Sequence, residues 1–172
     1  MSDLLETMID DLRQLVESES PSHDPQLLAK SAETVAALME RCLGTPPTLV
    51  EGGAGPHVHW SGGGAPKVLI LGHHDTVFPA GTLSQRPFAV ENGRATGPGV
   101  FDMKAGIVQA IHAVASLDDR SGVEILLSCD EEIGSLTSRE LLEERALACG
   151  AVLVLEPSGD GGALKPGRKG TG

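Results

Sequence analysis

The stretch LGHHDTV, residues 71–77, decides how the rest of this chain is interpreted. It continues the apolar run VLIL, residues 68–71, which is typical of a strand buried in a sheet. Side chains at positions i and i+2 lie on one face of a strand, so His73 and Asp75 are predicted to point the same way and His74 the opposite way. A histidine held by a nearby carboxylate is typical of a metal site. Alone, however, such a pair is a weak indication.

Helical and strand patterns alternate along the chain. Apolar residues recur at helical spacing over residues 4–16, 25–43, 107–117 and 138–148. Short apolar runs predict strands at residues 48–50, 57–60, 67–71, 88–90, 122–128 and 151–155, and Asn92-Gly93 predicts a hairpin turn. This alternation predicts the α/β class, with a mostly parallel central sheet in a three-layer sandwich.

Composition excludes several classes of protein. The 172 residues suffice for one domain with a real core. A net charge of −11 argues against nucleic acid or an anionic membrane as a partner. With one Trp and no Tyr, a site that stacks bases or sugars is not expected.

The cysteines and the N-terminus favour a cytoplasmic protein. Cys42, Cys129 and Cys149 are widely spaced and form no Cys-x-x-Cys pair, which fits free thiols in a reducing compartment. A catalytic role for Cys129 is disfavoured, because no activating base stands near it in the sequence. We see neither the pattern of a signal peptide nor an apolar run approaching the ~20 residues of a membrane span.

Acidic residues occur at three further positions, each after a strand or a loop. Asp102 follows a glycine-rich loop, the pair Glu131-Glu132 follows the strand at 122–128, and Glu156 follows the last strand. Functional groups of open α/β sheets gather beyond the carboxyl ends of the strands. We therefore expect most of these acids to meet His73 there.

One imidazole with several carboxylates suits two divalent cations, because a carboxylate can bridge a metal pair. Zinc accepts both nitrogen and carboxylate oxygen, whereas a calcium site would use oxygen alone. In the pair Glu131-Glu132, one carboxylate can bind metal while its neighbour takes a proton from water. Clustered carboxylates without a cation would repel one another.

Each of these acidic positions also has a simpler interpretation. Asp102 could cap the helix that begins near Lys104, residues 130–132 could form a solvated turn, and Glu156 could be a plain strand exit. His57 and His59 share a strand face and could bind metal, although an exposed strand face is favoured. The simpler interpretations are weaker for the acids taken together, because they do not explain why an acid occurs at every one of these positions.

Four blocks, in this order, resemble the di-zinc exopeptidase family that includes glutamate carboxypeptidase, acetylornithine deacetylase, succinyl-diaminopimelate desuccinylase and aminoacylase. The blocks are GHHDTV at 72–77, GPGVFDMKAG at 97–106, DEEIGS at 130–135 and LEPS at 155–158. Together they are highly specific, and the resemblance covers nearly the whole chain. The residues at 75–79 and 86–88 favour the glutamate carboxypeptidase branch of this family.

The resemblance implies a role for each residue of the site. His73 and Glu156 would be ligands of one zinc, Glu132 would bind the second, and Asp102 would bridge them, followed by a cis peptide to Met103. Asp75 would orient the ring of His73, and Glu131 would be the general base that activates water. The implied reaction is metal-dependent hydrolysis of an amide bond in a small peptide or N-acyl amino acid, with cobalt or manganese as possible replacements for zinc.

The resemblance also implies that the chain is the N-terminal part of such an enzyme. Residues 1–164 would belong to the catalytic domain, and residues 165–172 would begin the connection to a lid or dimerisation domain. In the family, the later part supplies the last zinc-binding histidine, which cannot be named in this sequence. The alternative hypothesis is therefore a non-catalytic fragment that binds at most one metal, with homodimer formation expected only for the full-length enzyme.

Overall fold

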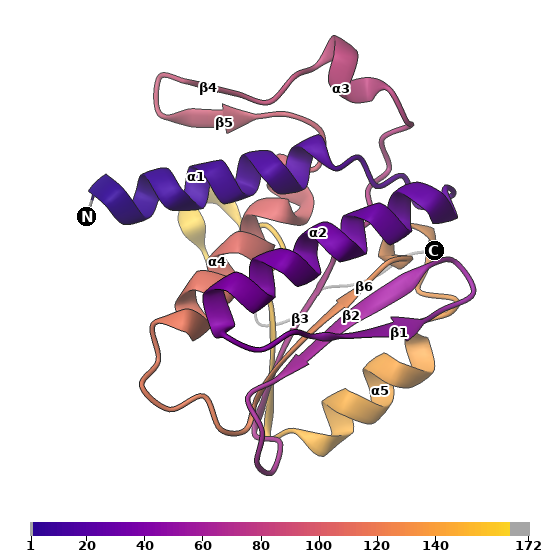
Figure 1. The fold of residues 1–172 in the computed structure, drawn as a ribbon, viewed down its shortest axis with the longest axis vertical. Coiled ribbons are helices and arrows are strands. Elements are labelled where there is room, and N and C mark those ends of the chain that lie inside the picture. Colours follow the sequence, from indigo (N-terminus) through magenta and orange to yellow (C-terminus); the bar gives the residue numbers. More distant parts are fainter. Residues whose placement is uncertain (1, 166–172) are drawn as a thin grey trace.

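The computed structural model describes residues 2–165 and has a five-stranded sheet at its centre (Figure 1). The strand order is β1-β2-β6-β3-β7. The central part is parallel, because β3 pairs in parallel with both β6 and β7, while β2 runs antiparallel to β6 and to β1. The strands are β1 Thr48–Glu51, β2 Pro56–Ser61, β3 Val68–His73, β6 Val123–Ser128 and β7 Ala151–Val154.

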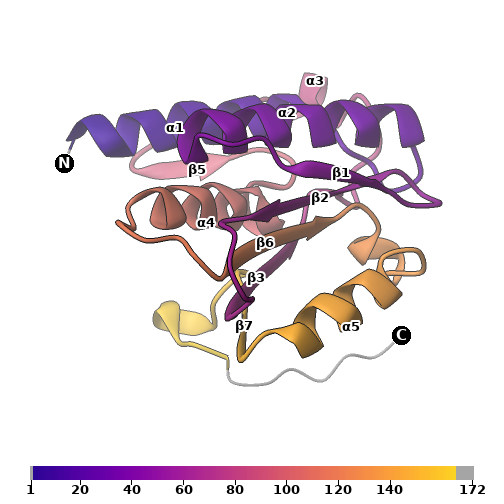
Figure 2. The same ribbon diagram turned by 60° about the horizontal axis from the view of Figure 1, so that its bottom comes forward.

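Helices cover both faces of this sheet, which confirms the predicted α/β sandwich. Helices α1 (Ser2–Glu17), α2 (Pro25–Leu43) and α4 (Ala105–Ala115) lie on one face. Helix α5 (Arg139–Ala148) lies on the other, as Figure 2 shows. The sheet is more mixed than expected, since two of its four strand pairings are antiparallel.

The core fills the space between the sheet and the three helices of the first layer. Its members are apolar residues of α1, α2, α4 and the strands, among them Leu15, Met39, Trp60, Ile111 and Ile125. Helix α4 ends at Ala115, so Leu117, which the helical pattern included, lies outside it and is 44% exposed. None of the described helices combines the length and the hydropathy that a bilayer crossing requires.

Local chemistry explains where α2 begins and ends. The Asp24 side chain accepts hydrogen bonds from the backbone N–H groups of Gln26 and Leu27, both at 3.1 Å, and Pro25 occupies the first turn. Gly44, with a φ of 80°, ends the helix in the left-handed conformation.

A small two-stranded unit is separate from the main sheet and lies next to α1 (Figure 1). The strands β4 (Ala89–Glu91) and β5 (Arg94–Thr96) are antiparallel, and the short helix α3 (Thr82–Gln85) precedes them. Asn92 and Gly93 both have positive φ at the turn, as the sequence predicted for this hairpin.

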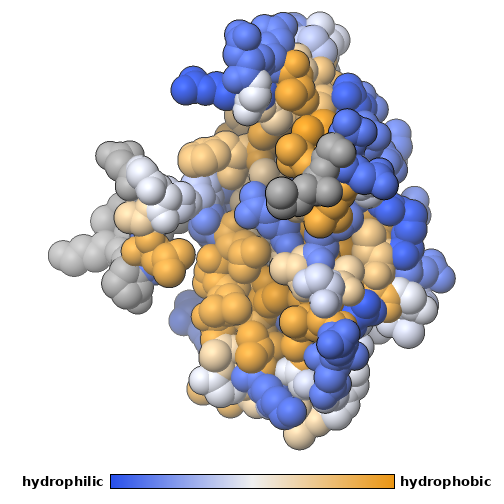
Figure 3. All heavy atoms as spheres, turned by 90° about the vertical axis from the view of Figure 1, so that its left-hand side faces the viewer, coloured by the Kyte–Doolittle hydropathy of each residue, from blue (hydrophilic) through white to orange (hydrophobic). Residues whose placement is uncertain are grey.

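The layer that contains α5 is thinly packed. No residue of α5 is buried, although its sequence predicted an amphipathic helix. In the edge strand β7, Leu153 and Val154 are 51% and 55% exposed. Figure 3 shows apolar side chains gathered on the face of the molecule that lies to the left in Figure 1. Exposed apolar surface of this kind is typical of contact regions.

Candidate metal centre

The imidazole of His73 lies at the centre of a group of carboxylates. His73 is the last residue of β3 and is buried. Its Nε2 lies 3.2 Å from Oδ1 of Asp102 and 3.4 Å from Oε1 of Glu156. Its Nδ1 lies 3.0 Å from the carbonyl oxygen of Asp75 and 3.3 Å from the Oδ1 of the same residue. Three of the acids that the sequence singled out therefore meet at one ring.

The two glutamates after β6 complete the group. His73, Asp102 and Glu132 each offer a ligand atom, and these atoms lie within 4.8 Å of one another. His73, Glu131 and Glu156 do the same. Two overlapping groups that share His73 thus contain five of the six residues that the sequence proposed for the site, and Asp75, the sixth, contacts the ring of His73 directly.

Asp75 links the two halves of the centre. Its Oδ1 accepts a hydrogen bond from the backbone N–H of Glu131, and its Oδ2 accepts one from that of Glu132, both at 3.2 Å. Oδ2 also accepts a bond of 2.7 Å from the hydroxyl of Ser22. Asp75 is completely buried, and despite its burial the bonds from His73 and Ser22 hold its pKa below the usual range. It therefore orients both His73 and the acidic turn Glu131–Ile133.

Sequence reasoning missed the segment that braces this loop. The hydroxyl of Ser20 donates a hydrogen bond of 2.6 Å to the carbonyl of His74, and the N–H of Thr76 donates one of 2.8 Å to the carbonyl of Ser20. Ser20 and Ser22 belong to the connection between α1 and α2, which sequence reasoning treated only as a helix break. The sequence around these two serines does not indicate whether their hydroxyl groups bond to a distant loop or to solvent.

His74 points away from His73, as predicted. Its Nδ1 lies 3.2 Å from the hydroxyl of Ser31, and its Nε2 lies 3.0 Å from the carbonyl of Pro56. The residue is completely buried, and this burial lowers its pKa to about 4. The ring is therefore neutral and serves the packing of α2 against the sheet.

Asp102 lies in the turn Val100–Lys104, directly before α4. The N-cap residue of α4 is Lys104, whose side chain makes no capping hydrogen bond. The peptide between Asp102 and Met103 is cis, as the resemblance implied. Met103 is buried under the centre, where its sulfur accepts a hydrogen bond of 3.3 Å from the backbone N–H of His73.

Lys104 is a buried cation that sequence reasoning did not single out. Its Nζ donates hydrogen bonds of 2.8 and 2.9 Å to the carbonyls of Leu15 and Ser18, at the end of α1. Burial lowers its pKa to about 7, although the charge of Glu19 opposes this shift. Lys104 ties α1 to the turn that carries Asp102.

The charges of the centre fit a cation. Burial, together with the neighbouring carboxylates, raises the pKa of Glu131 and of Glu132, although His73 opposes this shift. Burial alone would lower the pKa of His73, but its hydrogen bonds to Asp102, Asp75 and Glu156 raise it to about 12. The group therefore needs positive charge, which a proton on His73 supplies in part. A set of one imidazole and several carboxylates is also a donor set that zinc accepts.

A cavity of about 400 Å³ opens beside Glu132. Its walls are largely apolar and include Val77, Pro79 and Ile133. Ser22, which bonds to Asp75, and Thr76, which bonds to Ser20, also line the cavity. A small molecule in this cavity would lie next to the carboxylate of Glu132.

The chain matches the profile of the peptidase family M20/M25/M40 over residues 69–169. The chain belongs to this family. It is 37% identical to carboxypeptidase G2 of Pseudomonas sp. over 105 residues, which cover 58% of this chain and 25% of that protein. It is 35% identical to succinyl-diaminopimelate desuccinylase of Wolinella succinogenes over 112 residues, which cover 59% of this chain and 31% of the relative.

Solved structures of peptidases share the fold. A metallo-carboxypeptidase of this family from Sulfolobus solfataricus superposes with a TM-score of 0.70 at 22% identity, covering 92% of this chain and 38% of that one. Human carnosine dipeptidase 1 gives a TM-score of 0.66 at 19% identity, covering 87% and 38%. The sequence matches to carboxypeptidase G2 and to the succinyl-diaminopimelate desuccinylase span about a quarter to a third of the length of those two relatives.

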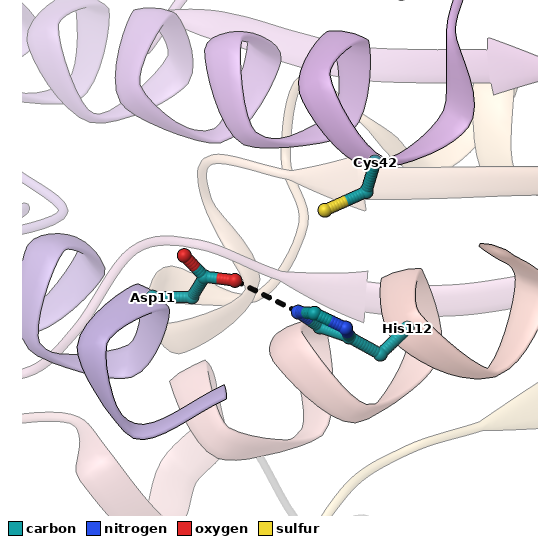
Figure 4. Close-up of side chains that lie close together, drawn as sticks. All are labelled: Asp11, Cys42 and His112. Carbon is teal, nitrogen blue, oxygen red and sulfur yellow. Dashed lines mark hydrogen bonds and ion pairs between the residues drawn. The ribbon is translucent and has the colours of Figure 1, made fainter. Parts of the chain in front are cut away.

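Two other groups of side chains of the types that bind metals lie away from this centre in the part of the chain that the structure describes. In one of them, Asp11, Cys42 and His112 come from α1, α2 and α4 (Figure 4). His112 Nε2 lies 2.7 Å from Asp11 Oδ2, and the guanidinium of Arg41 pairs with Asp11 Oδ1. The carboxylate already has two partners, so Asp11 joins α1 to α4 through His112 and to α2 through Arg41.

The structure agrees with the expectation that Cys129 is not catalytic, but it contradicts the exposed-face interpretation of β2 at His57. Burial raises the pKa of Cys129 to about 12, which favours the protonated thiol over the nucleophilic thiolate. His57 is buried, although an exposed strand face had been favoured. His57 and His59 have separate partners, since His59 Nε2 pairs with Glu124 at 3.2 Å.

Proposed function

We propose that this chain carries most of the metal centre of a hydrolase that cleaves an amide bond in a small peptide or an N-acyl amino acid. The observation that supports this most is the meeting of His73 with carboxylates from three separate segments at one edge of the sheet. Membership of the M20/M25/M40 family and the names of the relatives point to the same class of reaction.

In this proposal, His73 and Glu156 would hold one divalent cation, Glu132 would hold a second, and Asp102 would be a ligand shared by both. Zinc is the expected metal, and cobalt or manganese would fit the same donors. When bound, the cations would polarise the amide carbonyl and make a water molecule more acidic. Asp75 would keep the ring of His73 in place through its bond to Nδ1.

Glu131 is the proposed general base. Burial raises the pKa of its carboxyl group, and its backbone N–H is fixed by Asp75. Such a carboxylate can take a proton from the attacking water and give it to the amine as the amide bond breaks. The water oxygen bonds to the carbonyl carbon as Glu131 takes the proton. The C–N bond then breaks while the same proton passes to the nitrogen, which releases a carboxylic acid and an amine.

The test is the variant Glu131→Ala in the natural polypeptide that contains this sequence. Turnover of an N-acyl amino acid should fall by about 10²-fold or more, while metal content stays near that of the unchanged protein. Glu91→Ala, which removes an exposed carboxylate of β4, is the matched control. Unchanged turnover in Glu131→Ala would remove Glu131 from this role.

A second candidate function is a chain that binds at most one metal and does not catalyse. The proposed ligands favour this for the 172 residues alone, because Asp102 and Glu132 are the only donors assigned to the second cation. Peptidase activity and a sharp thermal transition in the 172-residue chain would refute it.

We further propose that residues 1–164 form the first part of a catalytic domain and that a lid or dimerisation domain follows. The predicted connection at 165–172 lies outside the described residues except for Lys165. A homodimer is expected only for the longer protein. Three free cysteines support a reducing cytoplasm as its location.

A further inference from the structure

The cavity beside Glu132 is formed by three segments that are far apart in the sequence. The connection between α1 and α2 supplies residues 21–24, the loop after β3 supplies four residues between positions 76 and 80, and the acidic turn supplies Glu132 and Ile133. Its volume of about 400 Å³ lies near the lower end of the range for small-molecule sites. The cavity therefore has room for one side group of a substrate rather than for a whole peptide.

Hydrogen bonds hold the walls of this cavity in place. The backbone N–H of Ser22 donates a bond of 3.3 Å to the carbonyl of Thr76, which joins the first segment to the second. The carboxylate of Glu19 accepts bonds of 2.8 Å from the backbone N–H groups of Gly81 and Leu83, directly after the second segment. Because these bonds lie within the protein, the cavity does not depend on a ligand for its shape.

Apolar side chains make up most of the lining. Val77, Pro79 and Ile133 contribute to it, and Val77 is 65% exposed although it is an apolar residue. An apolar group of a ligand that covers such side chains removes them from water, which favours binding. Ile133 also belongs to the turn that carries Glu131 and Glu132, so a group in contact with Ile133 is adjacent to the metal centre.

The charges at the cavity disfavour an anionic group. Of the described residues that line it, Asp24 and Glu132 are acidic and none is Lys or Arg. A cation bound by Glu132 would balance that carboxylate but would leave Asp24 in the lining. The N-terminus of α2, which would otherwise attract an anion, already has the carboxylate of Asp24 as its cap. His23 also lines the cavity but is exposed, so an ion pair with it would contribute little.

The position of the cavity relative to the general base indicates which part of the substrate it receives. Glu131 gives the proton to the leaving amine in the proposed reaction, so the amine lies on the side of Glu131. Glu131 is grouped with Glu156, whereas Glu132 is grouped with Asp102. The described lining includes Glu132 but not Glu131. The part of the substrate that reaches the cavity is therefore the acyl group, on the other side of the carbonyl carbon.

We propose that this cavity binds the acyl side group of the substrate and that Val77 is one of the residues that determine which group fits. The cavity takes an apolar group such as butanoyl in preference to an anionic group such as succinyl. This inference rests on the proposed function and deepens it by naming the class of acyl group. Val77 is a specificity residue and takes no part in the chemistry.

The first test compares N-acetyl, N-butanoyl and N-succinyl derivatives of one amino acid, the one whose N-acetyl derivative the natural polypeptide hydrolyses fastest. Butanoyl and succinyl groups both contain four carbons and differ in a terminal methyl group or carboxylate. From acetyl to butanoyl, kcat/KM should rise by about 4-fold for each CH₂ added. For the N-succinyl derivative it should be at least about 10-fold lower than for the N-butanoyl one. An equal or higher kcat/KM for the N-succinyl derivative would overturn the proposal.

The second test changes the exposed side chain of Val77, where substitution should leave the fold intact. Val77→Lys supplies a cation and should raise the succinyl-to-butanoyl ratio of kcat/KM by about 10-fold. Val77→Phe fills part of the cavity and should lower the butanoyl-to-acetyl ratio by about 10-fold. Val90→Lys and Val90→Phe change a valine of β4 that is 42% exposed and lies outside the described lining, so both ratios should stay the same. Unchanged ratios in both Val77 variants would remove Val77 from this role.

A third measurement needs no turnover. In the Glu131→Ala variant, labelled with ¹³C in its Val and Ile methyl groups, the N-butanoyl derivative should shift the signals of Val77 and Ile133 but not those of Val90. The N-succinyl derivative should need a concentration at least about 10-fold higher for the same shifts. Signals of Val77 and Ile133 that do not move would show that the acyl group binds elsewhere.

The outcomes separate this inference from the proposed function. If Glu131→Ala hydrolyses these derivatives as fast as the unchanged protein, the proposed function fails. If Glu131→Ala loses turnover but the unchanged protein prefers the N-succinyl derivative, only the acyl-group assignment fails. If the Val77 variants alter kcat/KM equally for all three acyl groups, the cavity receives another part of the substrate, and again only this assignment fails.

Discussion

Oδ2 of Asp75 accepts a hydrogen bond from the backbone N–H of Glu132, at 3.2 Å. Asp75 follows β3 and Glu132 follows β6, so this bond joins two neighbouring parallel strands just beyond their carboxyl ends. The same carboxylate orients His73 from the other side. One buried side chain therefore sets the spacing between two candidate ligands.

Asp75→Asn should weaken this spacing, because its amide oxygen can accept from only one of the backbone N–H groups of Glu131 and Glu132, while its NH₂ group faces the other. We expect zinc affinity to fall by about 10–100-fold and stability to fall by about 1–3 kcal/mol. Isothermal titration and urea unfolding measure the two effects. Ser22→Ala, which removes one donor to Asp75, is the milder control, and equal affinity in Asp75→Asn would contradict the role.

His74 should make the protein less stable in acid. Its pKa is about 4 in the folded protein and near 6.5 in the unfolded chain, so the unfolded chain binds the extra proton between these values. Its contribution to stability is complete above pH 6.5 and is lost as the pH falls towards 4, by about 3 kcal/mol in all. Urea unfolding from pH 4 to 7.5 should show a smaller slope in His74→Asn than in the unchanged protein, and parallel slopes would refute the assignment.

Zinc binding should release a proton. Hydrogen bonds to its carboxylate neighbours overcome the effect of burial and raise the pKa of His73 to about 12, so the ring is protonated at pH 7 in the metal-free protein. A ligand nitrogen must lose its proton when it binds a metal. Titration calorimetry in buffers of different ionisation enthalpy should therefore report about one proton released per first ion. A binding enthalpy independent of the buffer would contradict this.

Gly106 lies where α4 touches the chain that leads to Glu156. A Cβ at this position would lie 2.2 Å from the carbonyl oxygen of Leu155. Gly106→Ala should therefore displace Leu155, destabilise the fold by about 1–3 kcal/mol and weaken zinc binding through Glu156. Gly150→Ala is the matched control, because its Cβ would meet its nearest neighbour at 3.5 Å. Equal melting temperatures for the two variants would argue against this contact.

Much of the sheet and the candidate site could be predicted, because short stretches of sequence carry the patterns that indicate them. The apolar runs predicted the five strands of the main sheet, and the acids at strand ends predicted a meeting point next to His73. The antiparallel pairing of β2 with β6 was not predicted, since strand direction depends on how the chain returns to the sheet.

The supports of the site were missed for a different physical reason. Ser22 bonds to Asp75 across 53 residues, and His57 accepts from Cys129 across 72. A serine or histidine in sequence gives no indication of such a distant partner. The pattern of α5 predicted an apolar side, but burial also needs a surface to cover that side, and none of its side chains is buried among the described residues.

The measurement that tests the account most directly is zinc binding by His73→Ala, compared with His59→Ala and the unchanged protein, by equilibrium dialysis with metal analysis. The account predicts that His73→Ala loses affinity by more than about 100-fold while His59→Ala binds as the unchanged protein does. If all three proteins bind zinc equally, His73 and the carboxylates around it are not the metal centre.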